Sequence, residues 1–168
     1  RPAIAAQANT TNSCLLVDTE GEVTETIQIT QLSGSPINVA TAGTLSTLIP
    51  ANEKYLKSSL KLTGELNSDD IAFIRDMAGI DKNGNETEGI LKHLDISECD
   101  IVEGGSGYTY YSPTSSYNNY ISSISKTVAN TLPNGMFSKI GLVSVLLPES
   151  INVIDLYAFN GNESLTTI

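Results

Sequence analysis

Tryptophan is absent from this sequence, histidine occurs once, and basic residues are scarce. Nine Lys and Arg side chains stand against nineteen Asp and Glu, which gives a formal net charge of −10. Such an excess of negative charge repels phosphate backbones and anionic lipid, so we expect no nucleic-acid partner. The acidic residues are spread along the chain without a run of like charges, which is typical of a solvated surface.

The sequence also lacks a long apolar stretch. A membrane-spanning helix needs roughly 18 or more consecutive apolar residues, and no such segment occurs, so we expect no membrane insertion. Apolar residues still make up 40% of the 168 residues, which is enough for a folded core. The chain starts at Arg1 with the small residues of RPAIAAQANTTN, as after a secretory cleavage site, and we expect a processed or trimmed piece.

Catalytic and metal-binding patterns are missing as well. No G-x-S-x-G elbow accompanies His93, so we expect no Ser-His-acid hydrolase and no catalytic residue, although counting carboxylates does not exclude a glycosidase pair. The loop DKNGNETEG alternates oxygen-bearing residues, but a calcium loop would have Gly in place of Glu86 and Glu in place of Lys92. One His and two distant Cys give no zinc spacing, so we expect no metal and no cofactor. Cys14 and Cys99 are compatible with one disulfide bond or with two free thiols.

The first half of the chain shows two kinds of apolar spacing. Within residues 1–41, EVTETIQIT alternates with a period of two, which predicts a strand. Within residues 42–79, GTLSTLI predicts a short helix and NSDDIAFIRDMAG a longer one, with Asn67 or Ser68 as its N-cap and Gly79 at its end. We interpret residues 42–79 as a helical N-terminal cap.

The segment LKHLDISECDI is the most informative part of the sequence. It satisfies the leucine-rich template L-x-x-L-x-L-x-x-N/C-x-L at every specified position. Alternation around Asp95 predicts a short strand with aliphatic groups inward and Asp95 outward. The template returns in LVSVLL, begins again in the final LTTI, and has a degraded earlier copy in LKLTGEL.

These copies predict an α+β fold, a leucine-rich repeat solenoid with short parallel strands and the helical N-terminal cap. Residues 80–168 would then be irregular repeats, truncated at the C-terminus, in which one aliphatic row stacks strand on strand. The row consists of Leu60, Leu94, Val145 and Ile168.

Tyrosine is concentrated between two copies of the template. Residues 102–120, which we expect to be an insertion, hold five of the seven tyrosines. Tyr among Ser, Gly and Asn has the chemistry of an adaptable binding surface, although the rings could equally pack against the repeats and their own loop. The candidate binding residues are Tyr108, Tyr110, Tyr111 and Tyr117 in the insertion, and Asp95, Ser97, Ser144 and Leu146 on the outward strand face, which Lys61 and Thr63 share.

The segment LVSVLLPESINVIDLYAFNGNES resembles the unit of the BspA-type leucine-rich repeat proteins of bacterial surfaces. The resemblance is carried by Leu142, Leu147, Pro148, Ile151, Ile154, Ala158 and Phe159, and it is strong only from about residue 132 onward. Asn162 departs from it, because family units often have Cys there. The resemblance implies secretion, display at the cell surface, and binding of protein or glycan partners without catalysis.

Two functions follow as hypotheses. The first is a non-catalytic recognition module, secreted or at the bacterial cell surface, that binds a host or matrix protein or a glycan. The alternative is a structural spacer or capping segment of a larger surface protein, and an unrecognised type of enzyme is a third, weaker candidate. Because nothing closes the repeat that Leu165 and Ile168 begin, we expect a fragment or an end that contacts another molecule, with possible self-association through the uncapped repeat.

Overall fold

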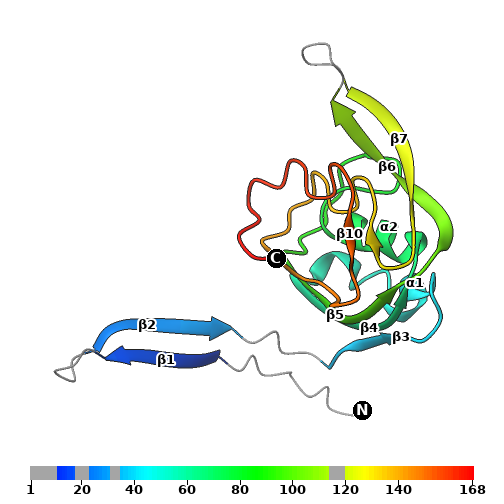
Figure 1. Cartoon of the computed structure of the whole chain (residues 1–168). Helices are drawn as coiled ribbons and strands as arrows, with labels where there is room; N and C mark the ends of the chain where they lie inside the picture. The colour runs from blue at the N-terminus through cyan, green and yellow to red at the C-terminus, as the bar shows by residue number, and fades with distance from the viewer. Residues whose placement is uncertain (1–10, 18–22, 31–34, 114–119) are drawn as a thin grey trace. The chain divides into compact units, whose positions relative to one another are not determined.

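The computed structural model describes residues 11–17, 23–30, 35–113 and 120–168, and it divides the chain into two compact units, Arg1–Ser35 and Pro36–Ile168. The first unit contains an antiparallel hairpin of β1 (Thr11–Val17) and β2 (Val23–Thr30) (Figure 1). Strand β2 confirms the strand predicted from EVTETIQIT.

The larger unit is built on a parallel sheet of four strands. In spatial order these are β3 (Ile37–Val39), β4 (Ser59–Leu66), β5 (His93–Ile101) and β9 (Ser144–Leu146) (Figure 1). Leu60, Leu94 and Val145 are register partners across three of these strands, and each side chain is at most 4% exposed. Beyond β9, Ser144 forms a parallel bridge with Thr167. The predicted alignment of the aliphatic row is therefore present for Leu60, Leu94 and Val145, whereas Ile168, the fourth predicted member, is 63% exposed.

Helix α2 (Ser68–Met77) packs mainly against β6 (Gly104–Pro113). Its start follows from the sequence, because the Asn67 side chain accepts the N–H of Asp69 and the Asp70 carboxylate accepts the N–H of Asn67 in a capping box. Its apolar face is buried, as the spacing predicted. The Asp70 carboxylate also accepts the N–H of Leu45, which fixes the start of α1 (Leu45–Leu48).

The leucine-rich repeat solenoid with an N-terminal helical cap is wrong as a fold class. The described part of the larger unit has a four-stranded parallel sheet, an antiparallel pair and a separate parallel pair, and the chain does not close into a solenoid. The two α-helices seen there, with the 3₁₀ turn η1 (Lys54–Leu56), flank β4, so residues 42–79 contribute a strand to the sheet instead of a cap. Apolar spacing specifies which residues are buried, but it does not specify which element covers them.

Most of the tyrosine-rich stretch is strand. β6 pairs antiparallel with β7 (Tyr120–Thr127), and Figure 1 shows this hairpin extending away from the parallel sheet. Register partners such as Tyr110 and Ser123 lie opposite each other along the hairpin. Of the predicted insertion, residues 104–113 and Tyr120 therefore belong to this hairpin.

The C-terminal part consists of two stacked coils, which we call the first coil (residues 131–146) and the terminal coil (residues 153–168). β8 (Thr131–Leu132) in the first coil pairs in parallel with β10 (Val153–Ile154) in the terminal coil. The backbone conformation repeats at a constant spacing, with positive φ at Gly135 and Tyr157 and again at Lys139 and Gly161. The rings of Phe137 and Phe159 stack with centroids 5.7 Å apart.

Candidate recognition surface

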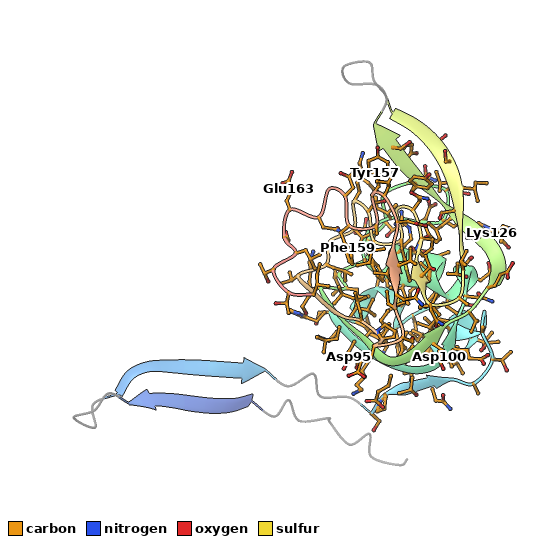
Figure 2. All side chains as sticks on the ribbon, viewed as in Figure 1. Asp95, Asp100, Lys126, Tyr157, Phe159 and Glu163 are labelled. Carbon is orange, nitrogen blue, oxygen red and sulfur yellow. The ribbon has the colours of Figure 1, made fainter. Side chains whose placement is uncertain are left out.

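One side of the parallel sheet is buried and the other carries mainly polar side chains. Because side chains alternate along a strand, residues on either side of the buried aliphatic row project to this second side. Two rows cross β4, β5 and β9 in register, Ser59–His93–Ser144 and Lys61–Asp95–Leu146. We define the polar sheet face as these residues together with Thr63, Ser97 and Glu98. Figure 2 labels Asp95 and Asp100 at opposite ends of β5.

Lys61 organises the charges of the polar sheet face. Its Nζ lies 2.7 Å from Oε1 of Glu98 and 3.4 Å from Oδ2 of Asp95. The hydrogen bond to Glu98, followed by the charge of Asp95, raises the pKa of Lys61 above its usual value. The lysine therefore stays protonated at neutral pH and links two carboxylates of β5.

Asp95 is held in place by its own strand. Its Oδ1 accepts hydrogen bonds from the Ser97 hydroxyl at 2.6 Å and the Ser97 N–H at 3.1 Å. Burial acts to raise the pKa of Asp95, but these hydrogen bonds and the charge of Lys61 outweigh it and keep the pKa below its usual value. The sequence predicts an outward Asp95, but the side chain is only 6% exposed. Its role is to fix Lys61 and Ser97 more than to meet a partner directly.

The β9 side of the face combines a polar pair with an exposed apolar residue. His93 Nδ1 and Ser144 Oγ are 2.9 Å apart, which joins β5 to β9. Leu146, the register partner of Asp95, is 43% exposed. A partner would therefore meet a leucine bordered by side chains whose positions are already fixed.

The tyrosine candidates lie on the β6–β7 hairpin instead of the polar sheet face. Tyr108 is 1% exposed, so its ring is part of the core. Tyr110 and Tyr111 are half-buried against glycines, since a Cβ added to Gly135 or Gly84 would come within 2.3 Å of Tyr110 or 2.7 Å of Tyr111. Tyr117 lies outside the described residues. The structure thus brings Asp95, Ser97, Ser144 and Leu146 together, and it places the described tyrosines elsewhere.

Glu98 is a member of the face that the sequence did not single out. In the leucine-rich template Glu98 is an unspecified position directly before Cys99. The structure continues β5 through Cys99, and an irregularity in its pairing with β4 sets Glu98 opposite Thr63. This displaced register brings Glu98 to Lys61, and the sequence carries no signal for it.

Other possible sites on the larger unit are less developed. A cavity of about 240 Å³ is lined by Arg75, Tyr111 and Lys139 among others, but the Arg75 guanidinium already donates to backbone carbonyls. The Asp81 carboxylate accepts hydrogen bonds from Asn83 and Asn85 of its own loop, which occupies its oxygens.

Two kinds of feature are absent from the described residues. They contain no cluster of three His, Cys, Asp or Glu side chains suited to hold a metal ion. None of their helices has the length and apolar character required to cross a bilayer.

Neither the known protein-family models nor the curated proteins contain a match to this chain.

Proposed function

We propose that the chain is a non-catalytic recognition module, secreted or displayed at a bacterial cell surface, that binds a protein partner through the polar sheet face. The observation that carries this proposal is the pair of register rows that cross three parallel strands, one of which ends at the exposed Leu146. The resemblance of the C-terminal segment to BspA-type units is the reason for the proposed location.

The polar sheet face has the make-up of a protein interface. Such interfaces combine a few apolar anchors with hydrogen-bonding groups around them. Here Leu146 is the anchor, and Lys61, Glu98 and the His93–Ser144 pair supply donors and acceptors. Because these side chains hold one another, binding costs less conformational entropy than ordering free side chains would.

A protein partner fits this face better than a glycan does. Sites for small molecules and sugars are typically concave and lined by aromatic rings that receive apolar faces of the ligand. None of the residues that define the polar sheet face is Phe, Tyr or Trp. The aromatic residues Tyr108, Tyr110 and Tyr111 are packed into the core or against glycines of the larger unit.

The test compares binding by the whole chain and by surface variants. Immobilised collagen, fibronectin and laminin, together with a glycan array, serve as probes. Leu146→Arg and Ser97→Arg each add a bulky charge to an exposed position on the polar sheet face. The matched control is Ile124→Arg on β7, since Ile124 is also exposed, at 71%.

We expect the unmodified chain to bind a protein probe and each sheet-face variant to bind it at least about tenfold more weakly, a loss of about 1.4 kcal/mol. The Ile124→Arg control should bind normally. If the sheet-face variants bind the protein probe as strongly as the Ile124→Arg control does, the binding surface lies elsewhere on the chain. If the chain binds glycans and none of the protein probes, the proposed protein partner is excluded. If neither the unmodified chain nor any variant binds a probe, the structural spacer is favoured. Substitutions at Tyr110 and Tyr111 should then leave binding unchanged as well.

A further inference from the structure

The cavity of about 240 Å³ lies where the C-terminal end of α2 meets β6 and the first coil. Its wall combines the apolar side chain of Ile80 and the ring of Tyr111 with three charged side chains, those of Arg75, Glu86 and Lys139. Ligand sites typically have apolar walls with a few charged or polar groups. A space of this size suits a small organic molecule, since a cavity of roughly 150 Å³ already holds benzene.

Arg75 is a buried cation without an anion beside it. Its side chain is 1% exposed, and it forms no ion pair with any carboxylate in the described part of the chain. The charge of Asp81 acts to raise the pKa of Arg75, but this carboxylate is held by the N–H groups of Asn83 and Asn85. A buried charge is costly unless it is paired, and carbonyl dipoles replace a counter-ion only in part.

The hydrogen bonds of Arg75 leave donors on one edge of its guanidinium group. Nη1 donates to the carbonyls of Gly135 at 2.9 Å, Met136 at 3.1 Å and Ser138 at 3.3 Å. Among the described residues, Nη2 has one acceptor for its two hydrogens, the Thr109 carbonyl at 3.3 Å, and Nε has none. Nε and Nη2 share an edge of the planar group, and such an edge can bind a carboxylate through two parallel hydrogen bonds.

We propose that this cavity binds a small organic monocarboxylate, whose charged group is the counter-ion of Arg75 and whose apolar part lies against Ile80 and Tyr111. The ring of Tyr111 is already positioned, because it packs against Gly84 and lies 5.4 Å from Nζ of Lys139. Since Nε has almost no contact with solvent, an exposed side chain of the wall must shift when the carboxylate reaches it.

The charges of the wall favour an anion with one negative charge. The two cations Arg75 and Lys139 against the carboxylate of Glu86 leave one positive charge around the cavity. A dianion such as inorganic phosphate would meet twice the repulsion from Glu86 and from the overall charge of −10. The flat edge of the guanidinium group also matches the flat carboxylate group.

The test uses the whole chain and benzoate, with benzamide as the neutral isostere and inorganic phosphate as the dianion. NMR follows the side-chain Nε–H resonance of Arg75, which moves downfield when it donates to a carboxylate. We expect a saturable downfield shift with benzoate and a Kd of about 1 mM or lower. Benzamide should bind at least about tenfold more weakly, because it lacks the charge. Phosphate should also bind more weakly than benzoate.

Variants of exposed side chains locate the ligand, and Arg75 itself is retained because its hydrogen bonds hold the first coil. Lys139→Gln should weaken benzoate binding about two- to fivefold at low salt, whereas Glu86→Gln should tighten it by a similar factor. The matched control is Lys126→Gln on β7, outside the cavity (Figure 2), which should leave the Kd unchanged. Ser97→Arg on the polar sheet face should leave it unchanged too, which separates this site from the proposed recognition surface.

Several results would each overturn the proposal. One is the absence of any shift of the Arg75 Nε–H resonance at benzoate concentrations roughly tenfold above the expected Kd. Equal binding of benzamide would show that the charge is not recognised, and tighter binding of phosphate would exclude the carboxylate class. Equal weakening in Lys139→Gln and Lys126→Gln would mean that benzoate responds only to the overall charge of the chain.

Discussion

The guanidinium carbon of Arg75 lies 5.0 Å from the centre of the Tyr108 ring, and both side chains are 1% exposed. The guanidinium also donates to the carbonyls of Gly135 at 2.9 Å and Met136 at 3.1 Å. Burial lowers the pKa of Arg75 to about 10, so the group stays charged at neutral pH. This arginine therefore joins helix α2, strand β6 and the first coil through one buried cation.

Replacing Arg75 should strongly destabilise the larger unit. Arg75→Met keeps an apolar stem but leaves the Gly135 and Met136 carbonyls without their donor. We expect a loss of about 3–5 kcal/mol in the free energy of unfolding, measured by urea denaturation. The exposed variant Lys82→Ala should change the free energy by less than about 0.5 kcal/mol. A loss below about 1 kcal/mol for Arg75→Met would mean that the buried cation is dispensable.

Gly64 is required where β3 pairs with β4. Its φ is +93°, and an added Cβ would lie 2.4 Å from the carbonyl oxygen of Val39. Gly64→Ala should therefore separate the two strands and lower the free energy of unfolding by about 2–3 kcal/mol or more. In the comparison variant Gly141→Ala, the close contact of the added Cβ is with the flexible end of Lys92, at 2.6 Å, while the Ala78 carbonyl oxygen lies at an ordinary 3.4 Å, and we expect a smaller loss in the free energy of unfolding. Equal losses in thermal or urea denaturation would argue against this role of Gly64.

Removing the Ser97 hydroxyl should make the stability of the fold less dependent on pH. The native pKa of Asp95 is depressed, so its contribution is present above its unfolded pKa of about 3.9 and disappears as pH falls through the native value. In Ser97→Ala the pKa of Asp95 in the folded chain should rise toward its usual value. We expect Ser97→Ala to lower the free energy of unfolding by a few tenths to about 1 kcal/mol at neutral pH, because the Ser97–Asp95 pair is partly solvated. The decrease should be smaller in acid.

Carboxyl NMR titration of Asp95 provides the direct measurement of this effect. Thr63→Ala, which removes a hydroxyl from the same face without touching Asp95, serves as the comparison and should leave the titration unchanged. An unchanged pKa in Ser97→Ala would show that the hydroxyl does not hold the carboxylate.

Cys99 should be unreactive in the native chain. Burial, assisted by the nearby carboxylates of Asp95 and Asp100, raises the pKa of this free thiol to about 12. Because the thiolate is the nucleophile, iodoacetamide at about pH 8 should leave Cys99 unmodified until urea is added. Mass spectrometry of the peptide that contains Cys99 reports the modification. Rapid labelling without urea would show that the thiol is accessible.

Local features of the fold could be predicted because neighbouring residues determine them. The N-cap at Asn67 and the strand through Asp95 are both readable from short segments, and both are present. The aliphatic row through Leu60 and Leu94 was predictable for the same reason, since its residues share one template.

The global architecture could not be read in this way. The solenoid was wrong because the template identifies buried positions and not the elements that cover them; here α2 and the β6–β7 hairpin take part in the core. The buried roles of Arg75 and Tyr108 depend on contacts between distant segments. The place of Glu98 beside Lys61 depends on a register irregularity, and apolar spacing carries no record of it.

Recognition through the polar sheet face is tested most directly by hydrogen exchange of the partner-bound chain. The chain is measured alone and with whichever matrix protein it retains. We predict slower exchange in β5 and β9 around Ser97 and Leu146, with the β6–β7 hairpin unchanged. Protection confined to the hairpin, with β5 and β9 exchanging as in the free chain, would contradict the account.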